Sequence, residues 1–450
     1  MKMTDSAEEV QRQKLPPRVY VIGSLTQFAM GLHQPFLLAY MIDMGASYAE
    51  LGAFRSVGNA APSVLQPAWG AWSDKIGHAK GFVAFGTLTG LAMVFLFLWA
   101  ATPIEMILLY GIQSILFSIQ IPTWQSLLGG LMDEEHRGTE LGRLGMATSV
   151  ASLVATLASG FIAGFPALIP SLRAALGDFG LILLPSVEAW REVYYLPFYF
   201  TAIFGIVTSI LSLTIREGKR DPAKKREFPP VLTLLSRPGD FRRFALVSVF
   251  FSFAMSMAWP YFIVVQKDWL GFTNLEIAIA SAVMSVTVIL FTIPMGNLSD
   301  RVGRKPLILA GRGSLFIVPL MYAVATHAIM IYMANALAGF SVATSVNSIT
   351  AYIFDIAPEK ERGAHLAVFN TFTGIIYFFG ALTSGLLGDS MALVMGAHFA
   401  VFSMMVLSAV LRLISSSLYL MLREPREYSS NMRMELRSLV LRRKIDADVN

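Results

Sequence analysis

The chain has 450 residues, of which 55% are hydrophobic and 14% charged, and its mean hydropathy is +0.59. Because soluble globular proteins carry about 25% charged and about 45–50% apolar residues, this composition disfavours a soluble enzyme, a disordered protein and a nucleic-acid-binding protein. The net charge is +5, there is no cysteine, and the six histidines form no metal-ligand pattern, so we expect no disulfide, no metal and no cofactor.

Twelve apolar runs follow one another along the chain. Each is long enough to cross a bilayer core of about 30 Å, which takes about 20 helical residues. The runs of the first half cover residues 19–43, 48–72, 80–101, 104–131, 139–164 and 192–215. Those of the second half cover residues 243–266, 273–297, 305–326, 328–355, 364–388 and 393–421. The sequence therefore predicts an all-α integral membrane protein with twelve transmembrane helices.

The segments between the runs divide the chain into five parts. We expect an N-terminal tail at 1–18, a six-helix bundle at 19–215, a charged linker at 216–242, a second six-helix bundle at 243–422 and a C-terminal tail at 423–450. The stretch 165–190, between the fifth and sixth runs, is apolar but interrupted by prolines and a glycine. These breakers predict a re-entrant or surface-lying helix there rather than a further span.

The basic residues lie almost entirely on one side of the predicted membrane. If both termini are cytoplasmic, 29 of the 35 lysines and arginines fall in cytoplasmic segments and three in outer loops, as the positive-inside rule requires. We therefore expect a multi-pass protein of the cell membrane with both termini in the cytoplasm. Arg55, Arg312 and Arg412 lie within the runs. The last two are expected to extend toward the cytoplasmic interface.

The two halves of the chain are copies of each other. Six pairs of features recur with a spacing of 225 or 226 residues, each at an equivalent place in its half. They are Pro35 and Pro260, Asp43 and Asp268, Glu50 and Glu276, Gly70 and Gly296, Arg137 and Arg362, and Gly160 and Gly385. Two duplicated six-helix halves are typical of transporters that rock around a central site.

The most specific repeated element is the pattern G-x-x-x-D-[KR]-x-G after the second and eighth runs. The second copy reads GNLSDRVGRKP from Gly296, and the first reads GAWSDKIGHAK from Gly70, with His78 and Ala79 in place of two basic residues. The doubled motif in a six-plus-six arrangement resembles the signature of the major facilitator superfamily, over nearly the whole chain. The resemblance implies two pseudo-symmetric six-helix bundles that transport a small solute by alternating access.

The motif residues also have physical roles of their own. The first glycine of each copy permits close approach of neighbouring helices, the last permits a tight chain reversal, and the aspartate suits a helix N-terminus. The resemblance implies that the aspartates meet helices of the opposite half in a cytoplasmic latch; the other reading is that the motifs only set topology. The candidate latch residues are Gly70, Asp74, Lys75, Gly77, Asp133, Arg137, Gly296, Asp300, Arg301, Gly303, Arg304, Asp355 and Arg362.

Polar residues recur at helical spacing within several runs. Because an unpaired polar group is unfavourable in lipid, these residues should face protein or water. The resemblance implies a central cavity between the halves, although the same residues could instead form hydrogen bonds between helices. The candidate cavity residues are His33, Gln34, Arg55, Asn59, Gln113, Gln120, Trp124, Trp259, Tyr261, Asn347, Asn370 and Tyr377.

Arg55 is the only charged side chain well inside a helix predicted to line the cavity. It lies about seven residues from the outer end of its run, roughly 10 Å deep at about 1.5 Å per residue. A charge within a membrane is a candidate functional residue. Arg55 is expected either to bind an anionic substrate or to brace an outer gate against Asp43 or Glu50.

These features predict a secondary active or facilitative transporter of a small organic solute. The alternatives are a multidrug/proton antiporter, an organic-anion carrier that uses Arg55, and a non-transporting receptor of transporter fold. The sequence shows no intramembrane nucleophile with a base, no paired mid-helix aspartates and no P-loop, so we expect no enzyme. The expected partners are a small-molecule substrate, with or without a coupled proton or other ion, and the lipid bilayer. We expect no nucleic acid, and a functional monomer.

Overall fold

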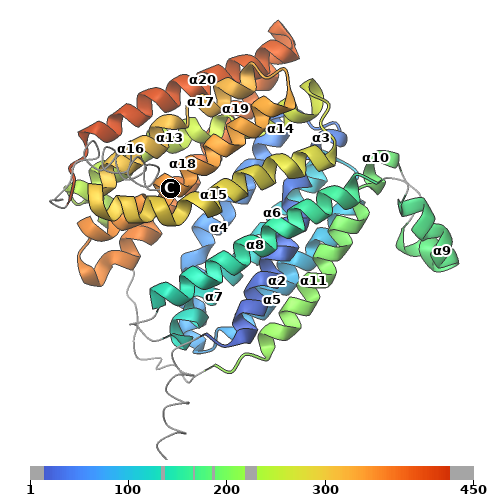
Figure 1. Cartoon of the computed structure of the whole chain (residues 1–450), viewed down its shortest axis with the longest axis horizontal. Helices are drawn as coiled ribbons and strands as arrows, with labels where there is room; N and C mark the ends of the chain where they lie inside the picture. The colour runs from blue at the N-terminus through green and yellow to red at the C-terminus, as the bar shows by residue number, and fades with distance from the viewer. Residues whose placement is uncertain (1–14, 133–136, 166–167, 185–187, 218–230, 426–450) are drawn as a thin grey trace, which may run out of the picture.

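The computed structural model describes residues 15–132, 137–165, 168–184, 188–217 and 231–425, and in this part of the chain every regular element is helical. Figure 1 shows two groups of long helices, one from each half, that approach each other near α3 and α14 and spread apart toward the far end of α15. Residues 1–14 of the N-terminal tail, Asp133, residues 218–230 of the linker and residues 426–450 of the C-terminal tail lie outside the described residues.

The described helices divide between the two halves of the chain. Those of the first half are α2 (Pro17–His33), α3 (Leu37–Asp43), α4 (Tyr48–Ile76), α5 (Lys80–Ala92), α6 (Pro103–Phe117), α7 (Gln120–Leu131), α8 (Arg137–Ala163), α9 (Leu168–Leu183), α10 (Ala189–Glu192) and α11 (Tyr195–Leu213). Those of the second half are α12 (Val231–Ser236), α13 (Asp240–Met257), α14 (Trp259–Val264), α15 (Asn274–Val302), α16 (Arg304–Ser314), α17 (Ile317–Ala323), α18 (Ala328–Ile356), α19 (Arg362–Met395) and α20 (Ala397–Ser417). Short segments η1 (Gln34–Phe36), η2 (Met93–Trp99) and η3 (Val265–Trp269) continue α2, α5 and α14.

Ten helical segments of the described chain are long and apolar enough to cross a membrane. The segments 17–43 and 48–76 occupy the first two places in the order and carry several candidate cavity residues, which lower their hydropathy. Counting these two by their place in the order gives the predicted twelve; by length and composition alone the count in the described chain is ten. The largest difference in boundary is at α19, which continues past the predicted end at 388 to Met395 because the break comes at Gly396, where φ is +87°.

The duplication is visible in how α4 and α15 begin and end. Ser47 and Thr273 precede the two helices, and each exchanges hydrogen bonds with the glutamate three residues further on, in a capping box. Each helix ends at a glycine with positive φ, Gly77 at +78° and Gly303 at +106°. Glycine adopts this conformation without steric penalty, so the chain can turn directly into the next helix.

Two equivalent helix contacts show where the repeat changes register. The Thr201 hydroxyl donates to the carbonyl oxygen of Ala29 at 3.2 Å, and the Ser408 hydroxyl donates to that of Ala254 at 2.6 Å. The acceptors are 225 residues apart and the donors 207, so the first half has 18 more residues between the two positions. The stretch 165–190, which contains α9, accounts for this insertion.

The same register relates two carboxylates outside the predicted sites. Glu217 accepts hydrogen bonds from the backbone N–H groups of residues 79 and 80, at 2.6 and 3.3 Å, where α5 begins. Glu424 accepts from those of residues 304 and 305, at 3.1 and 2.8 Å, where α16 begins. Each carboxylate caps a helix N-terminus, whose N–H groups have no helical partner and whose dipole favours an anion.

Helix α9 fills the predicted loop and lies apart from both groups of helices, beyond α10 in Figure 1. Its backbone bends at Gly177, where φ is +55°. The Arg173 guanidinium anchors it to the Glu192 carboxylate at 2.6 Å. Phe179 and Ile182 are 64% and 76% exposed, so this helix presents apolar side chains that the described protein does not cover. Such a face suits a helix that lies at a membrane surface.

Arg312 and Arg412 do not extend toward an interface, which corrects the expectation for both. Arg412 is 2% exposed, and its guanidinium donates to the carbonyl oxygens of Leu315 at 3.0 Å and Met255 at 2.7 Å. The guanidinium carbon of Arg312 lies over the Phe251 ring, 4.5 Å from its centre. Met255 lies in the last turn of α13 and Leu315 directly follows α16, so both carbonyls are acceptors that helix ends leave unpaired. Arg412 therefore binds these carbonyls inside the protein and does not reach toward the membrane interface.

Candidate functional site

The described contacts between the halves gather at one end of the molecule. We call it the closed end and define it by Asp43, Tyr48, Lys267, Asn274 and Asp389. The opposite end carries the two G-x-x-x-D motifs and is called the motif end. Since each crossing segment runs between these two ends, the position of a candidate residue along its helix gives its depth.

Asp43 is the centre of a polar network at the closed end. The Lys267 ammonium lies 2.6 Å from both of its carboxylate oxygens, and the Tyr194 hydroxyl donates to it at 2.5 Å. The Tyr194 hydroxyl also lies 3.4 Å from the side-chain oxygen of Asn274. Lys267 and Asn274 belong to the second half, so this network joins the halves. The side chains of Lys267 and Asp43 are 16% and 19% exposed, which reduces screening of the pair by water.

Asp389 forms a second bond between the halves. Its carboxylate oxygens accept from the backbone N–H of Tyr48 at 2.8 Å and of Ala49 at 3.0 Å, in the first turn of α4. A carboxylate is favoured at a helix N-terminus by the unpaired N–H groups and the dipole. Because the cap comes from α19, it holds a helix of one half against a helix of the other.

Small residues allow the helices of the two halves to pack closely below these polar groups. A side chain at Gly385 would collide with the Tyr48 carbonyl, and one at Gly160 would collide with Ala278 of α15. The Ser56 hydroxyl donates to the Phe378 carbonyl at 2.7 Å across the α4–α19 contact. The repeated glycines at 160 and 385 thus serve the two equivalent contacts, α8 with α15 and α19 with α4.

Three candidate cavity residues form hydrogen bonds between or within helices of their own half. His33 is 1% exposed, and its Nδ1 lies 3.0 Å from the Ala29 carbonyl oxygen and 3.4 Å from the Thr201 hydroxyl. Gln113, 4% exposed, donates to a carbonyl of α5 at 2.8 Å. Tyr261 is fully buried and donates to a carbonyl of α19. In this structure these side chains form hydrogen bonds inside their own half, which is the alternative to lining the central cavity. Their partners in the same or adjacent helices lie nearer than the space between the halves.

The other candidates are more accessible. The side chains of Gln34, Arg55, Asn347 and Asn370 are exposed. The Asn59 side chain donates to the Arg55 carbonyl oxygen at 2.6 Å. The Trp259 and Tyr377 rings pack together with their centres 4.8 Å apart.

Arg55 and Asn370 lie on the faces of α4 and α19 that point away from the apolar surface. Val64 and Phe379, each nine residues further on, are 50% and 52% exposed. Nine residues turn an α-helix by about 180° beyond whole turns. The charged and amide side chains therefore face the opposite side from these exposed apolar residues, as a cavity lining requires.

Gln120 and Trp124 line a cavity of about 270 Å³ between α2, α7 and α8. Thr26 and Gln27 line it from α2, and Thr148 from α8. Residues 23–27, 120–125 and 141–148 lie in the parts of their helices that are nearer the motif end. The first half thus contains a recess with polar lining residues in the part nearer the motif end.

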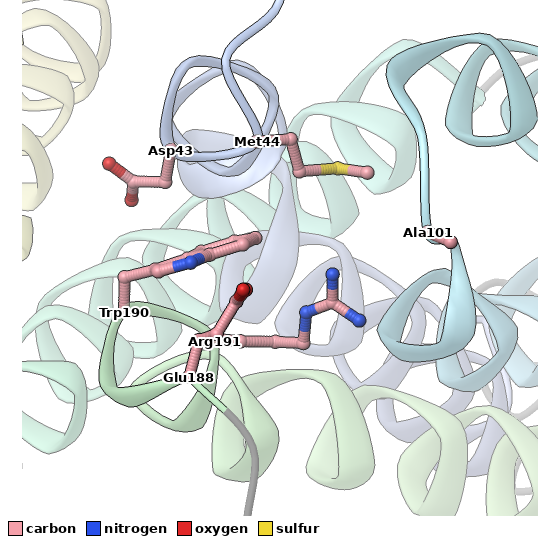
Figure 2. Close-up of a pocket in the computed structure, with 6 residues that line it drawn as sticks. All are labelled: Asp43, Met44, Ala101, Glu188, Trp190 and Arg191. Carbon is pink, nitrogen blue, oxygen red and sulfur yellow. The ribbon is translucent and has the colours of Figure 1, made fainter.

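A second cavity, of about 550 Å³, lies at the closed end and is shown in Figure 2. It is lined by Asp43, Met44, Ala101, Glu188, Trp190 and Arg191. The Arg191 guanidinium lies 5.0 Å from the centre of the Trp190 ring. In Figure 2 the Asp43 carboxylate points away from Arg191, which agrees with its pairing with Lys267.

The candidate latch residues of the second half pair within that half. Arg304 binds the Asp300 carboxylate at 2.5 Å and that of Asp355 at 3.3 Å. Arg362 donates to the Phe354 carbonyl at 3.0 Å, and Lys75 and Arg301 are exposed. Asp133 lies outside the described residues, as do the side chains of Asp74 and Arg137.

The first motif glycines do not bring helices into close contact in this structure, which corrects that expectation. A side-chain carbon added at Gly296 would meet nothing within 4 Å, and one at Gly70 would lie at an ordinary 3.6 Å from Pro122. The physical reason is that the two groups of helices spread apart toward the motif end (Figure 1). Close approach at these glycines requires another arrangement of the halves.

Arg55→Gln is expected to leave the closed end intact. Asp43 is bound by Lys267, and Glu50 accepts from the Ser47 backbone N–H at 2.8 Å; neither is bonded to Arg55 among the described residues. Distances between spin labels across the closed end, measured by double electron–electron resonance, should therefore not change. Longer distances would support the gate reading. Unchanged distances with lost binding of an anionic solute would support the anion reading.

Comparison with known proteins gives a consistent result. The family model described as Major Facilitator Superfamily matches residues 19–264 and 244–445. An uncharacterised MFS-type transporter of Methanocaldococcus jannaschii is 22% identical over 412 residues, covering 88% of this chain and 95% of that protein. The multi-drug resistance efflux pump PmrA of Streptococcus pneumoniae is 22% identical over 388 residues, covering 83% of this chain and 88% of that protein.

Two solved structures share the fold. The nucleoside transporter NupG, as a mutant, superposes with a TM-score of 0.72 at 13% identity, covering 89% of this chain and 98% of that one. A bacterial homologue of the human lysosomal transporter Spinster gives a TM-score of 0.72 at 17% identity, covering 92% of this chain and 98% of that one. From the duplicated halves, the doubled motif and the match of the family model to nearly all of its length, this chain belongs to the Major Facilitator Superfamily of transporters.

Proposed function

We propose that this protein is a secondary active or facilitative transporter that moves a small organic solute by alternating access. The observation that carries the proposal is the arrangement of the duplicated halves, bonded to each other at the closed end and spread apart at the motif end (Figure 1). A rocking motion of two pseudo-symmetric bundles around a central site requires contacts of this kind that can be exchanged between the two ends.

The motif end is the cytoplasmic end in this proposal. The basic residues support this orientation, since 29 of 35 lie in segments on that side. Both termini are then cytoplasmic, the protein resides in the cell membrane, and the described conformation faces inward. The spans 19–215 and 243–422 act as the two moving bodies.

The proposed partners are few. The substrate is a small molecule, moved with or without a coupled proton or other ion, and the surrounding partner is the lipid bilayer. We expect the monomer to be the working unit, without nucleic acid and without enzymatic chemistry. Multidrug export is the second candidate, favoured by the similarity to the PmrA efflux pump.

The test combines transport with a change at the latch. Purified protein in proteoliposomes should exchange a radiolabelled solute across the membrane, whereas a receptor of transporter fold would bind without flux. Asp300→Asn removes the carboxylate charge that, in the proposed latch, meets a helix of the opposite half when the motif end closes; in the described conformation this carboxylate pairs with Arg304 within its own half. It should favour the inward-facing state and slow transport, with little loss of folded protein. Labels at Gly130 and Ser236, both exposed and on opposite halves, report the distance at the motif end.

A matched control is Asp240→Asn, which makes the same chemical change. Asp240 pairs with Arg243 at 3.9 Å within the second half, and its side chain is 44% exposed. This variant should match the wild type in both transport and distance. An Asp300→Asn protein with unchanged distances would rule out the latch.

A further inference from the structure

The cavity between α2, α7 and α8 is lined by both polar and apolar residues. Gln27, Gln120 and Gln125 contribute three side-chain amides, and Trp124 contributes an indole ring. Gln27 and Gln125 are exposed, so their amides are accessible from the open side. An amide offers two donors and an acceptor with two lone pairs, and an indole offers a single donor and an apolar face. The lining is thus rich in hydrogen-bonding groups that do not carry a charge.

Gln120 carries the argument furthest. Its side chain is 8% exposed and makes no hydrogen bond to any described residue. Its amide is not among the side-chain groups of the described chain that are sealed from water without a partner, so it stays accessible from the cavity. Gln113 lies two turns earlier on the same side of this crossing segment and donates to a carbonyl of α5 at 2.8 Å. The two glutamines therefore differ: one is used by the fold, and the other faces the cavity with its hydrogen-bonding capacity unused.

Among the described residues, none of those that line the cavity carries a charge. The acid nearest in sequence, Glu140, is already occupied, because it accepts from the Leu15 backbone N–H at 3.0 Å, the Tyr20 hydroxyl at 2.8 Å and Arg143 at 2.9 Å. Arg55 lies near the opposite end of its helix, roughly 15 Å closer to the closed end at about 1.5 Å per residue. A charged ligand would give up its hydration here without meeting an opposite charge.

We propose that this cavity binds a neutral, ring-containing solute that carries several hydroxyl or amide groups, the chemistry shared by sugars and nucleosides. The Gln120 amide pairs with a hydroxyl or ring amide of the ligand, Gln27 and Gln125 hold its outer groups, and the Trp124 ring stacks on its flat face. The volume of about 270 Å³ suits a small solute of one or two rings. This assignment rests on the proposed transport function for its physiological role, since it names the class of substrate.

The experiment uses matched neutral and charged probes on the purified full-length protein. Uridine and D-glucose are compared with uridine 5′-monophosphate and glucose 6-phosphate, which add only a phosphate. A ligand that binds the native state raises its melting temperature. We expect uridine or glucose to raise it, and the matching phosphate to have at least about tenfold weaker affinity. Which neutral probe binds separates the nucleoside from the sugar.

Two variants then locate the site. Gln120→Leu should lower the affinity for the neutral probe about tenfold or more, with the melting temperature of the free protein unchanged, because no protein hydrogen bond is lost. Gln113→Leu should do the reverse, lowering the melting temperature while keeping the affinity. Equal binding of the phosphates, no binding of either neutral probe, or full affinity in Gln120→Leu would each overturn the proposal. Flux of some other solute in proteoliposomes would leave the transport function standing in those cases, and binding without flux would contradict that function alone.

Discussion

Lys267→Met is expected to open the closed end. The lysine ammonium lies 2.6 Å from both oxygens of Asp43 in a pair that is largely shielded from water. Without the ammonium, that carboxylate keeps the Tyr194 hydroxyl as its remaining described partner. The free energy of the conformation in which this end is closed should then rise by about 2 kcal/mol. This corresponds to roughly a 30-fold shift in the equilibrium between the described conformation and those in which this end is open.

The measurement is the distance between spin labels at Ala101 and Leu393, two exposed positions on opposite halves. Because the chain has no cysteine, labels can be attached to introduced cysteines without removing native ones. Longer distances are expected in Lys267→Met, and the double variant with Asp43→Asn should be no worse than the single one.

The control for charge removal is Arg237→Met. Arg237 pairs with Glu361 at 3.3 Å, but both belong to the second half, and their side chains are 57% and 35% exposed. Such a pair contributes little to stability, and it does not join the halves. This variant should keep the wild-type distances. If Lys267→Met kept them as well, the network around Asp43 would not be what holds the halves together.

Arg412→Leu is expected to have the largest effect on stability. The variant leaves the carbonyl oxygens of Met255 and Leu315 without the donor that now binds them at 2.7 and 3.0 Å. Pro319, four residues after Leu315, has no backbone N–H to replace it. Each unpaired buried acceptor costs about 1–3 kcal/mol. Relief from burying the charge offsets part of this loss, so we expect a net destabilisation of about 2 kcal/mol.

Thermal unfolding of the purified protein in detergent measures this loss. Arg412→Lys should recover part of it, because an ammonium can still donate to one of the two carbonyls but lacks the planar fork that reaches both. Arg243→Leu, at a side chain 63% exposed, should leave the melting temperature within error of the wild type. A wild-type melting temperature for Arg412→Leu would show that these carbonyls find other partners.

The crossing segments and their order could be predicted because they depend on local properties. Apolar length places the spans, and the predicted starts at residues 48 and 273 lie within one residue of the starts of α4 and α15. The repeat spacing places equivalent positions in the two halves. The exact length of the insertion that contains α9 could not be predicted from the sequence. It follows from equivalent hydrogen bonds in the two halves, such as Thr201 with Ala29 and Ser408 with Ala254.

The site was less predictable, because helical spacing identifies a face but not what that face meets. Gln113 and Gln120 share a stripe, yet only the structure shows that one bonds to α5 and the other lines a cavity. In the sequence, Lys267 and Asp389 are ordinary loop and helix-end charges. Their partners, Asp43 and the start of α4, lie 224 and about 340 residues away in the chain. No local signal could have paired them.

The carboxylate of Asp389 caps α4, and this makes the α4–α19 contact different from the equivalent α8–α15 contact. The position 225 residues earlier is Gly164, which has no carboxylate to offer the equivalent helix α15. The contact of α4 with α19 is therefore fastened by charge, while that of α8 with α15 depends on the close packing of Gly160 against Ala278. The contact of α8 with α15, which has no such cap, should therefore separate first. In the proposed motion, the first opening at the closed end would then form off-centre, along α8 and α15, so that a solute passes on that side while the contact of α4 with α19 still serves as a hinge.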